Sequence, residues 1–174
     1  MDLDCLNKAD PDTFTKQLDG IFEHSPWIAR KAADKRPFSS IEELYQAMVS
    51  VVQEASPEEK NKLIEAHPRL GGSGKMTAES RREQEGAGLR RLKGGEADSF
   101  TRLNLEYEKR FDFPFIMAVR GLTKQEIYAA MKERISRSKA QESKTAINEI
   151  CKIARFRLED KFSSESDQTE NDAG

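Results

Sequence analysis

Cysteines, histidines and long apolar segments are all scarce in this 174-residue sequence. Cys5 and Cys151 are the only two cysteines and lie far apart, so we expect no disulfide framework and a reducing, cytoplasmic environment. The two histidines, His24 and His67, lack the spacing of zinc ligands, so no metal site is expected. No apolar run reaches the roughly 20 residues of a membrane-spanning helix, and the acidic start Met1–Cys5 does not resemble a secretory signal. These absences argue against disulfide-rich, metal-dependent and membrane-spanning classes of protein.

A surplus of either charge is also absent. Lys and Arg number 29 and Asp and Glu number 31, which gives a formal net charge of −2. Because proteins that bind nucleic acids normally carry a basic surplus, this balance argues against a nucleic-acid partner. Hydrophobic residues make up 36% and charged residues 34% of the chain. The length and composition suit one globular domain with a sufficient core and a strongly charged surface.

Hydrophobic periodicity is helical along nearly the whole chain. Apolar residues between Ile41 and Ala55 recur every three or four positions, as on the buried face of an amphipathic helix. Three helix starts show capping-box spacing: Ser39 with Glu42, Ser56 with Glu59, and Thr123 with Glu126. Pro68 predicts that the helix after Ser56 ends at His67. Further helices are expected over about 77–92, 100–111 and 140–162, with one or two more in residues 1–40. The helix after Thr123 has an apolar stripe formed by Ile127, Met131 and Ile135.

The expected fold is an all-α, single-domain helical bundle of about seven to nine helices over residues 1–162. Residues 163–174 are polar, acidic and without aromatics, which predicts a disordered acidic tail. The run from Phe113 to Val119 is the one candidate strand. Because a single strand would have no partner, we expect an extended, buried segment that leads into a helix.

His67 is the first candidate for chemistry. A histidine at a helix end, followed by a proline, lies beside exposed carbonyl groups, and its ring titrates near neutral pH, which suits proton transfer. The same position suits an ordinary histidine that interacts with the helix dipole, and the residues leave both interpretations open. Gly72–Lys75 resembles the end of a phosphate-binding loop but lacks the earlier glycine and the Ser or Thr after the lysine, so we interpret it as a turn.

Two further polar positions stand out on helices. Glu83 and Gln84 precede two small residues by one turn and can offer an acceptor and a donor to a ligand, or simply belong to a solvated helix. Arg157 lies on or beside the apolar stripe of the last helix, where it must extend to solvent or meet an anion. A buried guanidinium there would bind a ligand carboxylate or form a structural salt bridge. That stripe is formed by Ile147, Ile150, Ala154 and Leu158.

Several short motifs occur in a recognisable order between about residues 3 and 162. They are Glu23–Trp27, Arg36–Phe38, Ala66–Leu70, Glu83–Gln84 with Ala87–Gly88, Leu103–Asn104 with Tyr107, Arg110–Ile116, Ala118–Gly121 and Ile153–Leu158. Together they resemble the OHCU decarboxylase family, whose members convert 2-oxo-4-hydroxy-4-carboxy-5-ureidoimidazoline to (S)-allantoin in urate breakdown. Asp112 stands where that family usually has a glycine.

The resemblance implies an all-α carboxy-lyase that needs no cofactor and is usually a homodimer. Its implied partner is a small ureidoimidazoline substrate, with no membrane or nucleic acid involved. By resemblance, His67, Glu83 and Arg157 are the catalytic residues. The implied substrate-binding residues are Pro68, Ser80, Arg81, Arg82, Glu83, Gln84, Phe115, Ile116, Met117, Ala118 and Val119. In this scheme Arg157 supplies positive potential to an anionic part of the ligand, and His67 engages the departing carboxylate or the 4-hydroxyl group.

Two alternatives remain on the sequence. One is a non-catalytic helical protein-interaction module, which would not require His67, Glu83 and Arg157 to converge. The other is a related lyase whose specificity has drifted to another ureide. The short loop from Leu70 to Thr77 and the presence of Asp112 are the features that would permit such a drift.

Overall fold

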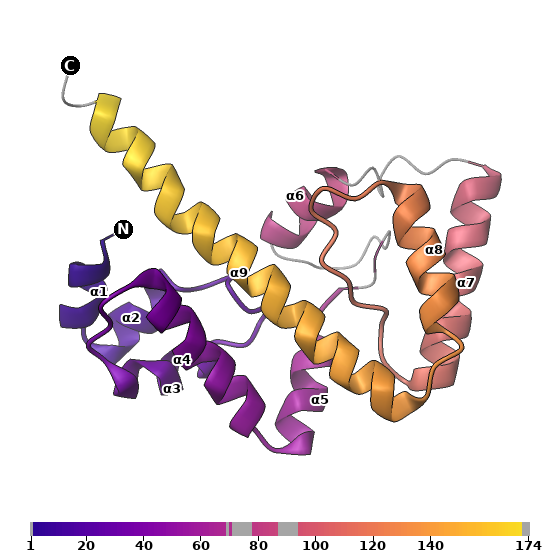
Figure 1. The fold of residues 1–174 in the computed structure, drawn as a ribbon, viewed down its shortest axis with the longest axis horizontal. Helices are drawn as coiled ribbons and strands as arrows, with labels where there is room; N and C mark the ends of the chain where they lie inside the picture. The colour runs from indigo at the N-terminus through magenta and orange to yellow at the C-terminus, as the bar shows by residue number, and fades with distance from the viewer. Residues whose placement is uncertain (1, 69, 71–77, 87–93, 172–174) are drawn as a thin grey trace. The chain divides into compact units, whose positions relative to one another are not determined.

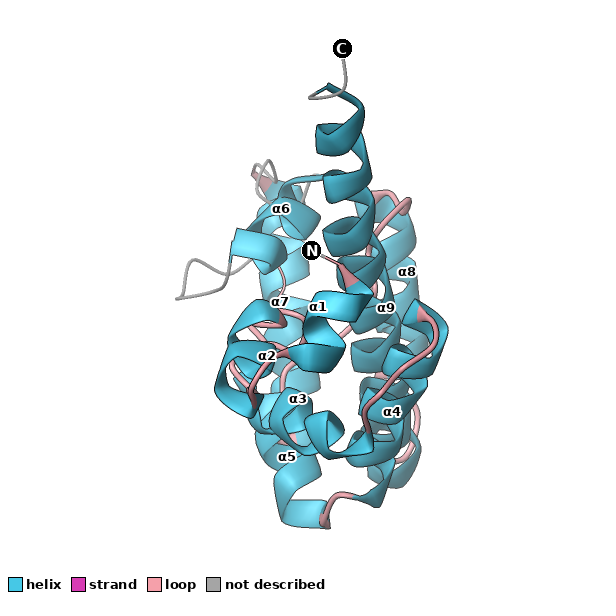
Figure 2. Ribbon diagram, turned by 90° about the vertical axis from the view of Figure 1, so that its left-hand side faces the viewer, coloured by secondary structure: helices cyan, strands magenta, loops and turns pink. Residues whose placement is uncertain are grey.

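Nine α-helices and one 3₁₀-helix make up the regular structure of the described residues. The computed structural model describes residues 2–68, 70, 78–86 and 94–171, and the side chains of 78–80 and 164–171 lie outside this description. In chain order the elements are α1 (Leu3–Lys8), α2 (Pro11–Gln17), α3 (Trp27–Ala32), the 3₁₀-helix η1 (Ala33–Lys35), α4 (Ile41–Glu54), α5 (Pro57–Ala66), α6 (Ala78–Gly86), α7 (Gly95–Phe111), α8 (Lys124–Arg134) and α9 (Lys139–Asn171). No strand occurs within these ranges (Figures 1 and 2). The prediction of an all-α fold is therefore confirmed.

The chain folds as two compact units. Unit 1 comprises Met1–Lys60 and Ile153–Gly174, and unit 2 comprises Asn61–Lys152. The boundaries between them fall inside α5 and α9, so each of these helices contributes residues to both units. Large apolar side chains are fully buried in each unit, among them Phe14, Ile28, Leu44 and Met48 in unit 1 and Tyr107, Phe111, Phe115 and Ile127 in unit 2.

Three short helices and the 3₁₀-helix η1 occupy residues 3–35 of unit 1, where the sequence predicted one or two helices. Pro11 begins α2 and Pro26 is the N-cap of α3, so each proline marks a new helix start. Arg36 donates from Nε to the carbonyl of Ala33 and from Nη1 to the carbonyl of Leu6, both at 2.9 Å. The last carbonyls of a helix lack hydrogen-bond donors within the helix. Arg36 supplies donors to carbonyls at the ends of two short helices, which allows these helices to end there. The hydrophobic periodicity of the sequence gives no indication of these Arg36 hydrogen bonds.

Helix starts follow the capping residues closely. The predicted boxes at Ser56–Glu59 and Thr123–Glu126 are confirmed, because in each the Glu backbone N–H donates to the hydroxyl at 3.2 Å. The third prediction, at Ser39, is wrong by one residue. Ser40 is the N-cap of α4 and accepts from the backbone N–H of Glu43 at 3.1 Å. The Glu43 carboxylate in turn accepts from the backbone N–H of Ser39 at 2.7 Å, which leaves Ser39 outside the helix.

In unit 2, α7 carries the aromatic core, and an irregular segment follows it. Phe100, Leu103, Tyr107 and Phe111, which recur at helical spacing, are buried. Asp112 ends α7 in the left-handed conformation, with φ of 61°, and its N–H donates to the carbonyl of Glu108 at 2.8 Å. Residues 113–123 then form neither helix nor strand before α8 begins. As predicted, the segment is not a strand, most of its apolar residues are buried, and a helix follows it.

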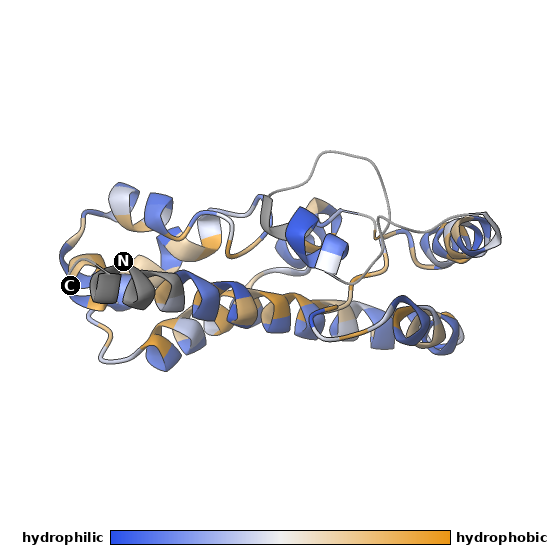
Figure 3. Cartoon of the chain, turned by 90° about the horizontal axis from the view of Figure 1, so that it is seen from above, coloured by the Kyte–Doolittle hydropathy of each residue, from blue (hydrophilic) through white to orange (hydrophobic). Residues whose placement is uncertain are grey.

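The last helix, α9, has a buried stripe that differs from the predicted one. Ile150, Ala154 and Leu158 are buried as predicted, and so is Arg157, which was expected on or beside the stripe. Ala146 is buried in place of Ile147, and Glu142 is an additional buried charged residue. Hydrophobic and hydrophilic residues alternate along the middle of this helix (Figure 3). α9 continues to Asn171 rather than ending at Phe162. The disordered tail over 163–174 stays a prediction. No helix among the described residues is long and apolar enough to cross a membrane.

Candidate active site

His67 follows directly on the last residue of α5, in unit 2. The helix ends at Ala66, one residue before the end that Pro68 predicts, and the backbone N–H of His67 donates to the carbonyl of Ile64 at 3.2 Å. The imidazole Nδ1 lies 3.0 Å from the carbonyl oxygen of Leu63. Because a carbonyl oxygen can only accept, Nδ1 is the ring nitrogen that carries a proton in this contact. The side chain is 6% exposed. The structure therefore shows the interaction with the helix end, and the role of His67 in proton transfer stays a prediction.

The predicted Glu–Gln pair lies on α6, also in unit 2. Gln84 is 2% exposed, whereas Glu83 is half-buried. Arg81 and Arg82 are exposed, and the side chain of Ser80 lies outside the described residues. Among the predicted residues on α6 whose side chains the structure describes, Gln84 is the buried one. A buried glutamine amide is a directional donor and acceptor.

The predicted substrate-lining segment, residues 115–119, lies in the irregular stretch between α7 and α8. Phe115, Ile116 and Val119 are buried, and the two residues between them, 117 and 118, are half-buried. The carbonyl of Ile116 accepts a hydrogen bond from Nη1 of Arg134 at 2.7 Å. One backbone acceptor of this segment is therefore bound to a protein side chain instead of being turned to a ligand.

Arg157 belongs to unit 1, where it forms an ion pair with a carboxylate of the protein. Its Nη1 donates to the carbonyl of Gly20 at 2.9 Å and to Oε2 of Glu23 at 3.1 Å. The side chains of Arg157 and Glu23 are 3% and 0% exposed. Of the alternatives that the sequence left open for Arg157, the structure shows the salt bridge, as a buried ion pair with Glu23.

Arg155, in contrast, is exposed and bonds Glu42 at 2.8 and 3.0 Å. These bonds raise the pKa of Arg155 above its ordinary value.

Unit 2 thus carries His67, Glu83, Gln84 and the 115–119 segment, whereas Arg157 is part of unit 1. The convergence of Arg157 with His67 stays a prediction, as do the catalytic and substrate-binding roles. A cavity of about 340 Å³ lies elsewhere in unit 2, at the first turns of α7 and α8, and none of the predicted site residues lines it. Its walls include Phe100, Lys124 and Tyr128.

Sequence reasoning missed several buried polar residues. Asn104, within a recognised motif but without an assigned role, donates from Nδ2 to the carbonyl of Leu70 at 2.8 Å, so α7 holds the chain three residues beyond His67. Arg134 and Glu142 were not singled out at all, and both are buried. A signal was present, because Arg134 lies seven residues after Ile127, on the face where apolar residues recur. The structure buries Arg134, and Ile135, the residue predicted for that stripe, is half-buried.

Comparison with known proteins identifies the family. A family model described as OHCU decarboxylase matches residues 7–159. The chain belongs to the OHCU decarboxylase family. The match includes residues of both units.

Relatives in this family are similar over most of the chain. A 2-oxo-4-hydroxy-4-carboxy-5-ureidoimidazoline decarboxylase of Haloferax volcanii is 44% identical over 160 residues, 92% of this chain and 95% of the relative. A uric acid degradation bifunctional protein of Bacillus subtilis is 46% identical over 158 residues, 91% of this chain. The match covers only 32% of that bifunctional protein. Among solved structures, an (S)-allantoin synthase superposes with a TM-score of 0.76 at 30% identity, covering 92% of this chain and 54% of that one.

Proposed function

We propose that this chain decarboxylates 2-oxo-4-hydroxy-4-carboxy-5-ureidoimidazoline to (S)-allantoin, without a cofactor, as a step of urate breakdown. Family membership across residues 7–159 supports the reaction, as does 44% identity to a relative that bears this name along nearly its whole length. The observation that carries the proposal is the state of His67. This buried imidazole is held at the end of α5 with Nδ1 3.0 Å from a helix carbonyl, so its ring has a defined orientation, as acid–base chemistry requires.

The chemistry requires little beyond binding and proton transfer. Loss of CO₂ breaks the bond between a ring carbon and its carboxyl group, and the electron pair left behind is delocalised into the ring. The protein must bind the anionic group, stabilise the developing charge and direct a proton to one face. His67 engages the departing carboxylate or the 4-hydroxyl group and takes part in proton transfer. Arg157 supplies positive potential, which its ion pair with Glu23 partly offsets.

The remaining predicted residues bind the planar part of the substrate. Gln84 and Glu83 hold the ureido and ring N–H groups, and the segment Phe115–Val119 lines the ring. Pro68 and the first turns of α6, including Ser80, Arg81 and Arg82, complete the substrate contacts. The proposed enzyme acts in the cytoplasm as a homodimer. Family resemblance supports both of these proposals.

A test of the reaction uses substrate made freshly from urate, with circular dichroism to follow the formation of optically active allantoin above the spontaneous racemic background. His67→Gln and His67→Ala should reduce turnover by about 100-fold or more while the far-ultraviolet spectrum is unchanged. His24→Asn is the matched control, because His24 is the other histidine, is exposed and has a positive φ of 47° that asparagine tolerates. This control should retain wild-type turnover.

Each alternative has its own outcome in this assay. Full activity of His67→Gln would reject the role of His67. Wild-type protein that fails to accelerate this reaction but turns over another ureide would indicate a lyase of drifted specificity. Wild-type protein with no turnover of any ureide would favour the interaction module.

A further inference from the structure

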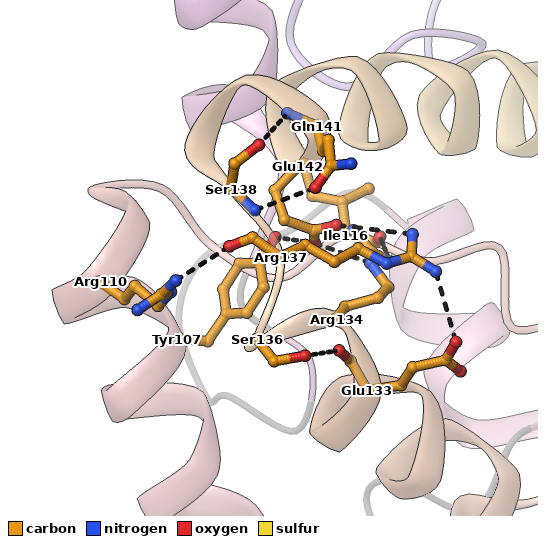
Figure 4. Close-up of polar contacts among 10 residues, drawn as sticks. All are labelled: Tyr107, Arg110, Ile116, Glu133, Arg134, Ser136, Arg137, Ser138, Gln141 and Glu142. Atoms are coloured by element: carbon orange, nitrogen blue, oxygen red, sulfur yellow. Dashed lines mark hydrogen bonds and ion pairs between the residues drawn. The ribbon is translucent and has the colours of Figure 1, made fainter.

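Three buried polar residues of unit 2 form one network at the turn between α8 and α9 (Figure 4). Arg134, the last residue of α8, donates from Nε to Oε1 of Glu142 in the first turn of α9, at 2.8 Å. The hydroxyl of Tyr107, on α7, donates to the same carboxylate oxygen at 2.5 Å. Arg134 is 5% exposed, and the other two are fully buried. Three helices are therefore joined at a single carboxylate.

The network also holds the irregular segment that follows α7. Nη1 of Arg134 donates to the carbonyl of Ile116 at 2.7 Å. The guanidinium carbon of Arg134 lies 4.3 Å from the centre of the Phe115 ring, a cation–π contact. Tyr107 meets the same ring edge-on, with centroids 5.2 Å apart. Because residues 113–119 belong to no helix or strand, side-chain contacts of this kind must define their conformation.

Stability alone does not explain a network of this composition. A buried ion pair costs desolvation free energy, and well-packed apolar residues of similar volume usually stabilise a core as well or better. This network also leaves Nη2 of Arg134 and Oε2 of Glu142 without a hydrogen-bond partner among the described residues, although Oε2 lies 3.9 Å from Nη1 of Arg137. What apolar residues cannot supply is a directional donor to the carbonyl of Ile116. A planar guanidinium can bond Glu142 through Nε and Ile116 through Nη1 at once.

We propose that Arg134 is a positioning residue: held by Glu142 and Tyr107, it fixes the Phe115–Val119 segment in the conformation that lines the substrate. This inference rests on the proposed function and extends it, because it assigns the shape of one wall of the site to residues that do not contact the substrate. Small displacements of a substrate-lining wall are costly for catalysis, because reacting groups must be held within a fraction of an ångström.

The first test removes all three polar ends together. In the triple variant Tyr107→Phe, Arg134→Met, Glu142→Leu no buried charge is left unpaired, so the protein should melt within about 5 °C of the wild type. The bond to Ile116 is lost, so kcat/KM should fall about tenfold or more, with a larger effect on KM than on kcat. A folded triple variant with kcat/KM within about twofold of the wild type would overturn the proposal.

Arg134→Lys provides a second test that does not depend on the triple variant folding. A lysine ammonium keeps a cation beside Glu142 but lacks the rigid planar group whose separate nitrogens bond Glu142 and the carbonyl of Ile116. We therefore expect kcat/KM, measured well below the melting temperature, to fall. Wild-type kinetics for this variant would count against the proposal. Arg137→Met is the matched control, because Arg137 also faces Glu142 but has no bond to Ile116. Its kinetic constants should match those of the wild type.

Hydrogen exchange separates this proposal from the proposed function, because it needs no substrate. In Arg134→Lys the backbone amides of residues 116–119 should exchange about tenfold faster than in the wild type, with the amides of α7 unchanged. Unchanged exchange would reject the positioning role even if the wild type is active. Faster exchange in a protein whose wild type has no decarboxylase activity would keep the role of Arg134 in holding the segment and reject the proposed function.

Discussion

The guanidinium of Arg157 and the carboxylate of Glu23 form a buried ion pair in unit 1, with Nη1 3.1 Å from Oε2. The two residues are 134 positions apart in the sequence. Arg157 also bonds the carbonyl of Gly20 at 2.9 Å, so the arginine is held by two groups of one loop. A guanidinium restrained in this way loses little conformational entropy when it meets a substrate.

The buried pair predicts a large stability difference between two carboxylates. Glu23→Ala removes the carboxylate that lies 3.1 Å from the buried guanidinium of Arg157, which should lower the free energy of unfolding by about 3–5 kcal/mol. Glu42→Ala removes the exposed partner of Arg155 and should change stability little, because water and salt screen that pair. Urea denaturation at neutral pH measures both. Equal losses for the two variants would contradict the prediction.

Arg157 should matter for turnover in a way that Arg155, two positions earlier, does not. In Arg157→Lys the positive charge is retained but the planar fork is lost, so kcat/KM should fall about 10- to 100-fold. Arg155→Lys should be active at the wild-type rate, because Arg155 is exposed and bonds the surface residue Glu42. Steady-state kinetics with folded protein decides this, and equal activity of the two variants would remove Arg157 from the proposed site.

Replacement of Asp112 by glycine should stabilise the protein. Its φ of 61° is in the left-handed region, where glycine is not strained and other residues are. Asp112→Gly should raise the free energy of unfolding by about 0.5–1 kcal/mol, despite the loss of an exposed contact with Lys139. Asp112→Val should be destabilising. The midpoint of chemical denaturation measures both effects, and a stabilised valine variant would show that φ is not the cause.

The two cysteines should differ in reactivity. Burial raises the pKa of the Cys151 thiol to about 11, whereas Cys5 is exposed. The thiolate is the reactive form, and a raised pKa means that Cys151 stays protonated at pH 8. Iodoacetamide at that pH should therefore modify Cys5 rapidly and Cys151 only after unfolding. Mass spectrometry of the native protein checks this, with Cys5→Ser as the control that should leave no rapidly modified thiol.

Local sequence signals located most helices because their causes are local. A hydroxyl followed by a glutamate three residues later forms its hydrogen bonds within one turn, so Ser56 and Thr123 could be recognised without the rest of the protein. The same reasoning ended α5 before Pro68. It failed at Ser39 because the neighbouring Ser40 meets the same pattern with Glu43, and spacing cannot choose between two overlapping registers.

Buried polar residues could be predicted only in part. Arg157 stood out because it broke an apolar stripe, yet its partner Glu23 could not be inferred, since nothing local links them. Arg134 and Glu142 carried a weaker signal in their helical spacing, and their attachment to Tyr107 and Ile116 depends on how three helices and a loop pack. Pairing between residues so far apart in the sequence depends on how the core packs, and hydrophobic periodicity does not indicate it.

The sequence by itself determined the all-α class and the starts of several helices, because patterns of neighbouring residues indicate both. The order of its short motifs also determined the family. Only the tertiary structure decided the ion pair of Arg157 with Glu23 and the attachment of Ile116 to Arg134. These depend on distances of about 3 Å between atoms that folding brings together, and hydrogen bonds lose their strength within a few tenths of an ångström beyond that.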